Sequence, residues 1–307
     1  MTMRTVYSKT IEKSCGFLFA RWSAGAKAFE LTLPPEKRII TDVYAPFYSG
    51  KVGTDMVKAM HVINPSIRKG IALRARYFDD YARRCIDDGY MQIVLLGAGY
   101  DSRFLRLDGF RHIRIFELDL ASTQAIKKAL TRRLLGKLPD HVTYVPIDFS
   151  KGELIPALLN GGYIRSRRTL FIWEGVTLFL NLEIITETLG RITELGPRNR
   201  VAFDFIPSEL VDDETDYRGN RQLLHLCSSI NEPLTFGSRP ENMRRLLSGL
   251  GYGDIVIAGL PETYRRYTGS DRIEDSYFFA TAEVMISGNG RNGDGENGEI
   301  HPGEDAS

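Results

Sequence analysis

Residues 91–103 read MQIVLLGAGYDSR, an apolar run that ends abruptly in two glycines. An apolar segment of this length, bounded sharply by glycine, is typical of a fully buried strand in a parallel sheet. Gly97 and Gly99 are separated by one residue, so the chain can turn tightly and a ligand can approach main-chain N–H groups without meeting a Cβ. Such a turn at the carboxyl end of a central strand is where nucleotide-like cofactors bind in open α/β sheets.

The residues that follow the turn discriminate between cofactors. A dinucleotide site favours a third glycine at position 102, where this chain has Ser102. A second strand-like segment, residues 113–119, ends in two acids, and Glu117 and Asp119 lie 20 and 22 residues after Gly97. That is close to the spacing at which an acid binds a ribose hydroxyl. The combination favours S-adenosylmethionine over NAD.

Several ordered segments resemble the leucine carboxyl methyltransferase family, and more narrowly its bacterial and polyketide-tailoring O-methyltransferase branch. The segments are LLGAGYDSRFLRL (95–107), FELDL (116–120), YVPIDF (144–149), FIWEGVTLFL (171–180) and EPLTFG (232–237). The resemblance covers roughly residues 70–285. It implies an α/β fold, a Rossmann-like seven-stranded methyltransferase sheet that is mostly parallel and has an antiparallel hairpin at its edge.

The resemblance also implies roles for cofactor-binding residues at the amino-acid and ribose ends. An arginine in the helix before the first strand would hold the carboxylate of the methionine moiety by a bidentate pair. Arg74 matches that position better than Arg76, and the alternative is that both are solvated surface residues. Asp119 would bind the ribose, with Glu117 as a less certain neighbour and a plain helix cap as the alternative for Asp119.

The remaining matched residues lie after the third and fourth predicted strands. Asp148 and Phe149 would bind the adenine, although Asp148 is also a candidate N-cap for a helix near residues 152–159. Glu174 would contact the cofactor or order the site, because an unpaired carboxylate would be costly to bury in the core. The predicted cofactor-binding residues are thus Arg74, Gly97, Gly99, Asp119, Asp148, Phe149 and Glu174.

The pattern of elements predicts one methyltransferase domain with additions. Residues 1–86 form an N-terminal helical cap, residues 87–286 the S-adenosylmethionine-binding domain, and residues 207–239 a lid inserted over the site. Residues 287–307 hold six glycines and no aromatic residue, which predicts a disordered tail. A crossover helix capped by Asp101 is expected over residues 101–107. Another is expected over residues 121–135, where Lys127, Lys128, Arg132 and Arg133 form a solvated basic stripe.

Composition excludes several other classes of function. The formal net charge is +1, so no overall electrostatic case exists for a nucleic-acid partner. Three cysteines without a C-x-x-C pair indicate a reducing compartment, and the scattered histidines show no metal-ligand spacing. No apolar run approaches the ~18 residues of a membrane span. We therefore expect a cytoplasmic protein that binds neither a metal nor a membrane.

The chemical class of the methyl acceptor is predicted from the absence of an evident general base. A carboxylate is already ionised at pH 7 and needs no general base, whereas a phenol or alcohol does. His225 in the lid is the one candidate base, and a surface or packing role is its alternative. Arg218, Arg221 and Arg239 are lid residues that would steer an acid. We therefore predict an S-adenosylmethionine-dependent O-methyltransferase acting on a small-molecule carboxylate, such as that of a polyketide-type metabolite.

Two alternatives remain open at this stage. The first is methylation of a protein C-terminal carboxylate, which would require a groove for a peptide chain. The second is an NAD(P)-binding oxidoreductase or a catalytically silent adenosyl-binding protein. The missing third glycine counts against NAD, and the acids at positions 119, 148 and 174 count against a silent relic. The sequence does not indicate an oligomeric state.

Overall fold

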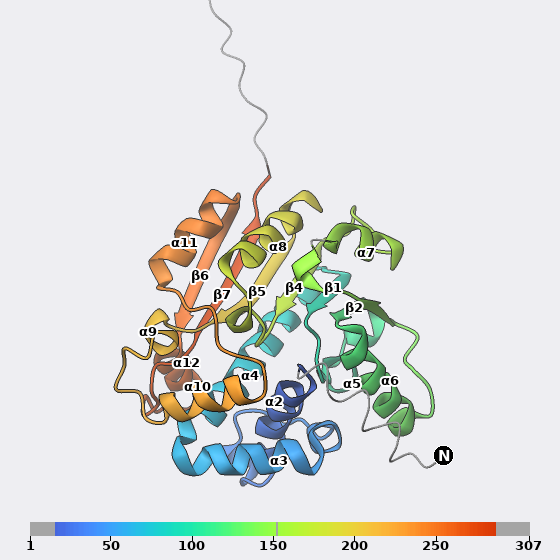
Figure 1. Ribbon diagram of the computed structural model, residues 1–307. Helices are drawn as coiled ribbons and strands as arrows, with labels where there is room; N and C mark the ends of the chain where they lie inside the picture. Colours follow the sequence, from blue (N-terminus) through green and yellow to red (C-terminus); the bar gives the residue numbers. More distant parts are fainter. Residues whose placement is uncertain (1–15, 152, 287–307) are drawn as a thin grey trace, which may run out of the picture.

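The computed structural model describes residues 16–151 and 153–286, so the tail predicted to be disordered lies outside the described residues. It contains one seven-stranded sheet in the order β3-β2-β1-β4-β5-β7-β6 (Figure 1). Strands β1 to β5 are parallel, and β7 runs antiparallel to both β5 and β6. This confirms the predicted fold class. The strands are β1 Gln92–Leu96, β2 Arg114–Asp119, β3 Val142–Pro146, β4 Thr169–Trp173, β5 Arg200–Phe205, β6 Tyr252–Gly259 and β7 Phe278–Val284.

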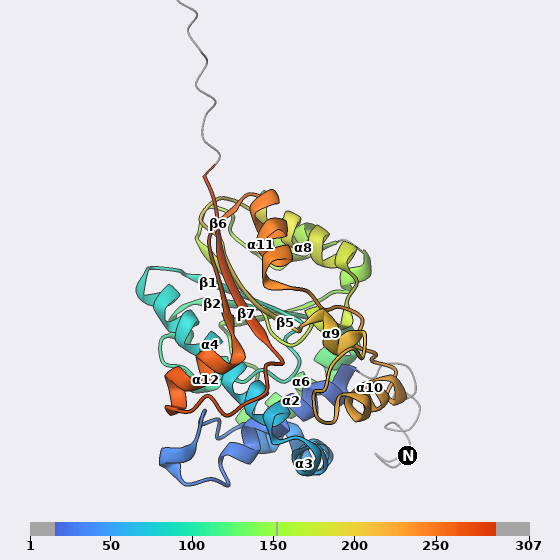
Figure 2. The ribbon, with the colours of Figure 1, turned by 90° about the vertical axis from the view of Figure 1, so that its left-hand side faces the viewer.

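Both faces of the sheet are covered by helices, which explains why β1 is buried along its whole length (Figure 2). Successive side chains of a strand point to opposite faces. Ile93 and Leu95 belong to a core with α4 (Pro65–Asp87) and α12 (Leu260–Thr268). Val94 and Leu96 belong to a second core with α7 (Leu154–Asn160), α8 (Leu182–Glu194) and α11 (Pro240–Gly249).

One connection differs from the sequence-based expectation. The helix after the glycine turn is only the short α5 (Arg103–Arg106), and Arg103 turns inward to partners on α4 and just after β4. The last two strands, β6 and β7, pair antiparallel at the edge of the sheet as predicted, and α12 lies between them in the sequence.

The helix α6 (Ala121–Leu135) has its predicted bounds, but its basic stripe is not uniformly solvated. Arg132 and Arg133 are exposed, whereas Lys127 is 1% exposed and its Nζ lies 2.7 Å from Glu117 Oε2. Burial raises the pKa of Glu117 to about 7, and Lys127 opposes that rise. The solvated interpretation is therefore wrong for Lys127, because a buried carboxylate on β2 requires a cation on the helix above it.

The N-terminal helices and the lid gather at one end of the sheet. In both ribbon views α2 (Gly16–Glu30), α3 (Ala45–Ile63) and α10 (Asn220–Ser229) lie together below the strands (Figures 1 and 2). The lid also contains the short α9 (Ser208–Val211). Within the described ranges, every helix is too short or too polar to traverse a bilayer.

The glycine turn after β1 needs glycine for two physical reasons. Gly97 and Gly99 have φ angles of 68° and 45°, in the left-handed region that residues with a Cβ rarely adopt. A Cβ on Gly97 would also overlap the side chain of Val176, which follows β4. The turn therefore packs directly against the loop at the end of the neighbouring strand, and the two loops form one surface.

We predict that Gly97→Ala lowers the free energy of unfolding more than Gly136→Ala does. Both positions have positive φ, so both variants carry a left-handed penalty of about 1–2 kcal/mol. At Gly136, however, no atom of the described residues lies within 4 Å of an added Cβ. Overlap with Val176 should cost Gly97→Ala a further ~1–3 kcal/mol in urea unfolding. Equal losses in the two variants would contradict the close approach of the loops.

Candidate functional site

A cavity of about 560 Å³ lies where the strands end, between the sheet, the N-terminal helices and the lid. Its polar wall comes from the glycine turn, from the ends of β2, β3 and β4, and from α4. The structure brings all seven predicted cofactor-binding residues into this one wall: Arg74, Gly97, Gly99, Asp119, Asp148, Phe149 and Glu174. Arg76 and Glu117 are not among the lining residues, because Arg76 pairs with Asp80 and Glu117 lies beneath α6.

Asp119 fixes the glycine turn as well as lining the cavity. Its Oδ2 accepts a hydrogen bond from the Gly99 N–H at 2.6 Å, and its Oδ1 accepts one from the Leu120 N–H at 2.7 Å. Burial raises the pKa of Asp119, and these two hydrogen bonds work against the rise. The side chain thus positions a backbone loop and presents an acceptor to the cavity.

Asp148 and Phe149 form the next part of the wall. Asp148 Oδ1 accepts hydrogen bonds from the backbone N–H and the hydroxyl of Ser150, at 3.1 and 2.7 Å. The hydroxyl contact holds the pKa of Asp148 below its usual range. The ring of Phe149 lies 5.8 Å from that of Trp173 at the end of β4. Asp148 therefore orders the 3₁₀ turn η4 (Phe149–Lys151) that carries Phe149, rather than capping α7.

Arg74 is buried between two carboxylates. Its Nε lies 3.2 Å from Glu174 Oε1, and its Nη1 lies 3.1 Å from Asp204 Oδ2. A Cβ on Gly175 would approach Arg74 Nη2 to 2.6 Å, so glycine is needed after Glu174. Burial would raise the pKa of Glu174, but Arg103 and Arg74 outweigh it and lower the pKa, which keeps the carboxylate ionised.

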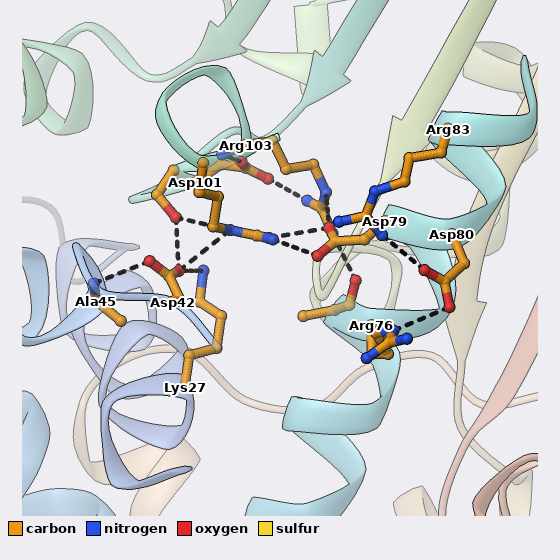
Figure 3. Close-up of polar contacts among 12 residues, drawn as sticks. Lys27, Asp42, Ala45, Arg76, Asp79, Asp80, Arg83, Asp101 and Arg103 are labelled. Carbon is orange, nitrogen blue, oxygen red and sulfur yellow. Dashed lines mark hydrogen bonds and ion pairs between the residues drawn. The ribbon is translucent and has the colours of Figure 1, made fainter. Parts of the chain in front are cut away.

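Arg74 and Glu174 are one end of a continuous chain of buried ion pairs. Glu174 Oε2 lies 2.5 Å from Arg103 Nη2, whose Nε lies 2.7 Å from Asp79 Oδ1 on α4. Arg103 also pairs with Asp101, and its charge holds the pKa of that carboxyl well below its usual range although burial acts to raise it. Figure 3 shows Arg103 lying between Asp79 and Asp101.

The chain of ion pairs continues from the sheet into the N-terminal helices. Arg106 pairs with Asp79, and its Nε lies 3.5 Å from Asp42 Oδ2. Asp42 in turn lies 3.2 Å from Lys27 Nζ on α2 and accepts hydrogen bonds from Ser102 Oγ and the Ala45 N–H (Figure 3). With every member ionised, five carboxylates face four cations, a net charge of −1: Lys27, Asp42, Arg74, Asp79, Asp101, Arg103, Arg106, Glu174 and Asp204.

The sequence analysis did not identify most members of this chain of ion pairs. Arg103 lies in a motif that was recognised, but its type and position alone do not reveal that it turns inward. Asp79 and Asp204 lie in segments whose pattern indicates only a helix and a strand. Their partners lie far along the chain, and single-sequence patterns report local structure. The one available signal was their polarity at positions where apolar residues are expected.

The lid contributes mainly apolar residues and one acid, Glu232, to the lining of the cavity. Among its described residues, the lining includes Leu210, Tyr217, Leu223, Cys227, Glu232 and Leu234. The three arginines expected to steer an acid do not line the cavity, and two of them pair with lid acids instead: Arg221 with Asp213 and Arg239 with Glu209. His225 is exposed on α10 and does not line the cavity. It therefore lies outside the site where a base would act.

The described residues contain no group of three or more histidine, cysteine or acidic side chains that could hold a metal. The free thiols of Cys85 and Cys227 are both buried. The polar wall of the cavity consists of carboxylates, Arg74, Lys27 and the backbone of the glycine turn.

Comparisons with known proteins agree on the fold and the family. The chain is 30% identical over 206 residues to a Mycolicibacterium vanbaalenii protein named "Putative S-adenosyl-L-methionine-dependent methyltransferase", which covers 64% of this chain and 65% of that protein. A Mycobacterium sp. protein of the same name is 34% identical over 155 residues, half of each chain. The chain thus spans about half to two thirds of the length of these curated relatives.

Solved structures show the same architecture. A DUF574 family protein from Streptomyces avermitilis superposes with a TM-score of 0.59 at 15% identity, covering 85% of this chain and 96% of that one. A protein from Thermobifida fusca has a TM-score of 0.58 at 12% identity, with 87% and 94% covered. The leucine carboxyl methyltransferase family model matches residues 20–193, which run from α2 through the glycine turn into α8. The chain belongs to the leucine carboxyl methyltransferase family.

Proposed function

We propose that this protein is an S-adenosylmethionine-dependent O-methyltransferase that forms methyl esters of small, largely apolar carboxylic acids, such as polyketide-type metabolites. The observation that carries the proposal is the single cavity at the strand ends. It joins a polar wall that fits an adenosyl amino acid to an apolar wall that fits the body of an acceptor. The names of the curated relatives, which specify S-adenosyl-L-methionine, support the choice of cofactor.

The polar wall fits the parts of S-adenosylmethionine one by one. The open turn at Gly97 and Gly99 admits a ligand against main-chain N–H groups, and Asp119 at its side would accept hydrogen bonds from ribose hydroxyls. Asp148 and Phe149 would hold the adenine. Arg74 donates single hydrogen bonds from Nε, Nη1 and Nη2 to protein partners, which leaves an N–H on each terminal nitrogen for a ligand carboxylate.

Charge in the wall favours a cationic cofactor over a dinucleotide. Four members of the ion-pair chain line the cavity, two cations and two acids: Lys27, Arg74, Asp101 and Glu174. Asp119 and Asp148 add two further acids to the same lining. A dinucleotide brings an anionic pyrophosphate, which such a wall would repel. Position 102, where a dinucleotide site would have its third glycine, holds Ser102. Its hydroxyl donates a hydrogen bond to Asp42 at 2.5 Å, so the residue has a structural role within the protein.

When bound, S-adenosylmethionine supplies a methyl group carried on a sulfonium, so the protein contributes orientation and exclusion of water. Orientation can contribute on the order of 7–11 kcal/mol. The acceptor side is lined by apolar side chains from α2, α4, the segment after β4 and the lid: Phe19, Trp22, Ile67, Ile71, Leu178, Phe179, Leu210, Leu223 and Leu234. A histidine base is absent from the described lining, which suits an acceptor that is already ionised.

The volume of the cavity supports a small acceptor rather than a protein terminus. Its volume of about 560 Å³ lies within the ~300–1,000 Å³ that is usual for small-molecule sites. The lid residues Leu223 and Leu234 and the α2 residues Phe19 and Trp22 line the same space from different elements.

We predict that the protein binds S-adenosylmethionine and S-adenosylhomocysteine in calorimetric titrations and does not bind NAD. Asp119→Ala should weaken both adenosyl ligands at least about tenfold, because it removes the ribose acceptor and releases the Gly99 N–H. Asp140→Ala is the matched control, since Asp140 is exposed and pairs only with Lys137 among the described residues. Binding of NAD alone, or unchanged affinity in Asp119→Ala, would contradict the cofactor assignment.

We predict that His225→Ala retains methyl-ester formation within about twofold of the wild type, because an exposed side chain outside the cavity cannot take a proton from the acceptor. Ester formation from a panel of apolar carboxylic acids is measured by mass spectrometry. Loss of turnover in His225→Ala with intact cofactor affinity would show that the reaction needs a base, and the carboxylate acceptor would then be wrong.

A further inference from the structure

The helix α10 of the lid ends in a Schellman motif that places an acid where an apolar residue is usual. Asn231 has a φ of 56°, and its N–H donates to Ser228 O at 3.0 Å. The Glu232 N–H donates to Cys227 O at 2.9 Å. In this motif the residue two positions past the C-cap commonly makes a hydrophobic contact with the last turn of the helix. Here that residue is Glu232, so the motif itself does not explain its side chain.

Glu232 lines the cavity, and its carboxyl group has no hydrogen-bonding partner among the described residues. Its Oε1 is buried, and no described residue forms a hydrogen bond with it. Burial raises the pKa of Glu232 to about 7, and the carboxylate of Asp119 adds to that rise. A buried polar atom without a partner costs folding free energy. Because Glu232 lines the cavity, a ligand bound there could supply the missing partner.

The backbone holds this carboxyl group in place. Just after Glu232, the N–H groups of Thr235 and Phe236 donate to Leu178 O at 2.8 and 3.2 Å. Leu178 belongs to the 3₁₀ turn η5 (Thr177–Phe179), which follows the Glu174 loop, and Phe236 is itself buried in the core. The position of Glu232 is therefore tied to the same strand end that carries Glu174.

We propose that Glu232 binds a ribose hydroxyl of the adenosyl cofactor from the lid, while Asp119 binds the ribose from the sheet. The inference rests on the proposed function and extends it to a lid residue outside the part of the chain that matches the family model. Asp119 and Glu232 line one cavity, and two carboxyl groups there can each accept a hydrogen bond from a ligand that carries two neighbouring donors. The vicinal hydroxyls of a ribose supply two such donors. The lid thereby contacts the cofactor directly.

The experiment is a calorimetric cycle with two ligands, S-adenosylhomocysteine and its 2′,3′-dideoxy analogue, against wild type, Glu232→Ala and Glu232→Gln. Glu232→Ala should lower the affinity for S-adenosylhomocysteine about tenfold and change the affinity for the dideoxy analogue less than about twofold. Glu232→Gln keeps the shape of the side chain and some hydrogen-bonding capacity. Its affinity for S-adenosylhomocysteine should therefore lie between those of the wild type and Glu232→Ala. Without ligand, thermal unfolding of Glu232→Gln should occur at the wild-type temperature or above it, since a costly buried carboxyl is removed.

The control is Glu214→Ala, which removes an exposed acid of the same lid. Equal weakening of both ligands in Glu232→Ala and Glu232→Gln would overturn the inference, because the effect would not depend on the ribose hydroxyls. Unchanged affinity with lost turnover would also overturn it and assign Glu232 to the acceptor. A wild-type protein that binds neither S-adenosylmethionine nor S-adenosylhomocysteine would overturn the proposed function, an outcome distinguishable from failure of the inference alone.

Discussion

The chain of buried ion pairs from Lys27 to Asp204 is the interaction on which the site depends. It joins α2, the segment before α3, α4, the turn after β1 and the ends of β4 and β5. Removing one partner from a buried pair typically costs about 3–5 kcal/mol, because the other charge is left without compensation. These elements therefore hold one arrangement relative to one another, and the cavity keeps its shape.

This network also explains how charged groups can be buried next to the apolar part of the cavity wall. Arg74 and Glu174 are ionised and pre-oriented by partners behind them, so they need no rearrangement when a ligand enters. Pre-oriented dipoles and charges act strongly where water is excluded. Asp119 behaves in the same way, since it is fixed by the backbone N–H groups it accepts from. The polar wall of the cavity is therefore set before a ligand binds.

The sequence predicted what local patterns encode. The buried strand β1, the glycine turn and the acids that end β2, β3 and β4 all follow from short segments, and the structure brings those residues into one cavity. It did not reveal that Lys127 is buried against Glu117, or that Arg103 turns inward, because both depend on partners contributed by other elements. Glu232 escaped notice for a similar reason. Its motif was recognised, but only the end of α10 and the lining of the cavity show what its carboxyl faces.

The most direct test of this account is a crystal structure of the protein with S-adenosylhomocysteine. The account predicts density in the described cavity, with the ribose hydroxyls within hydrogen-bonding distance of Asp119 and Glu232. The amino-acid end of the ligand should lie beside Arg74 and Glu174, and the adenine beside Phe149. A ligand bound outside this cavity, or one whose ribose lies away from Asp119, would contradict the account.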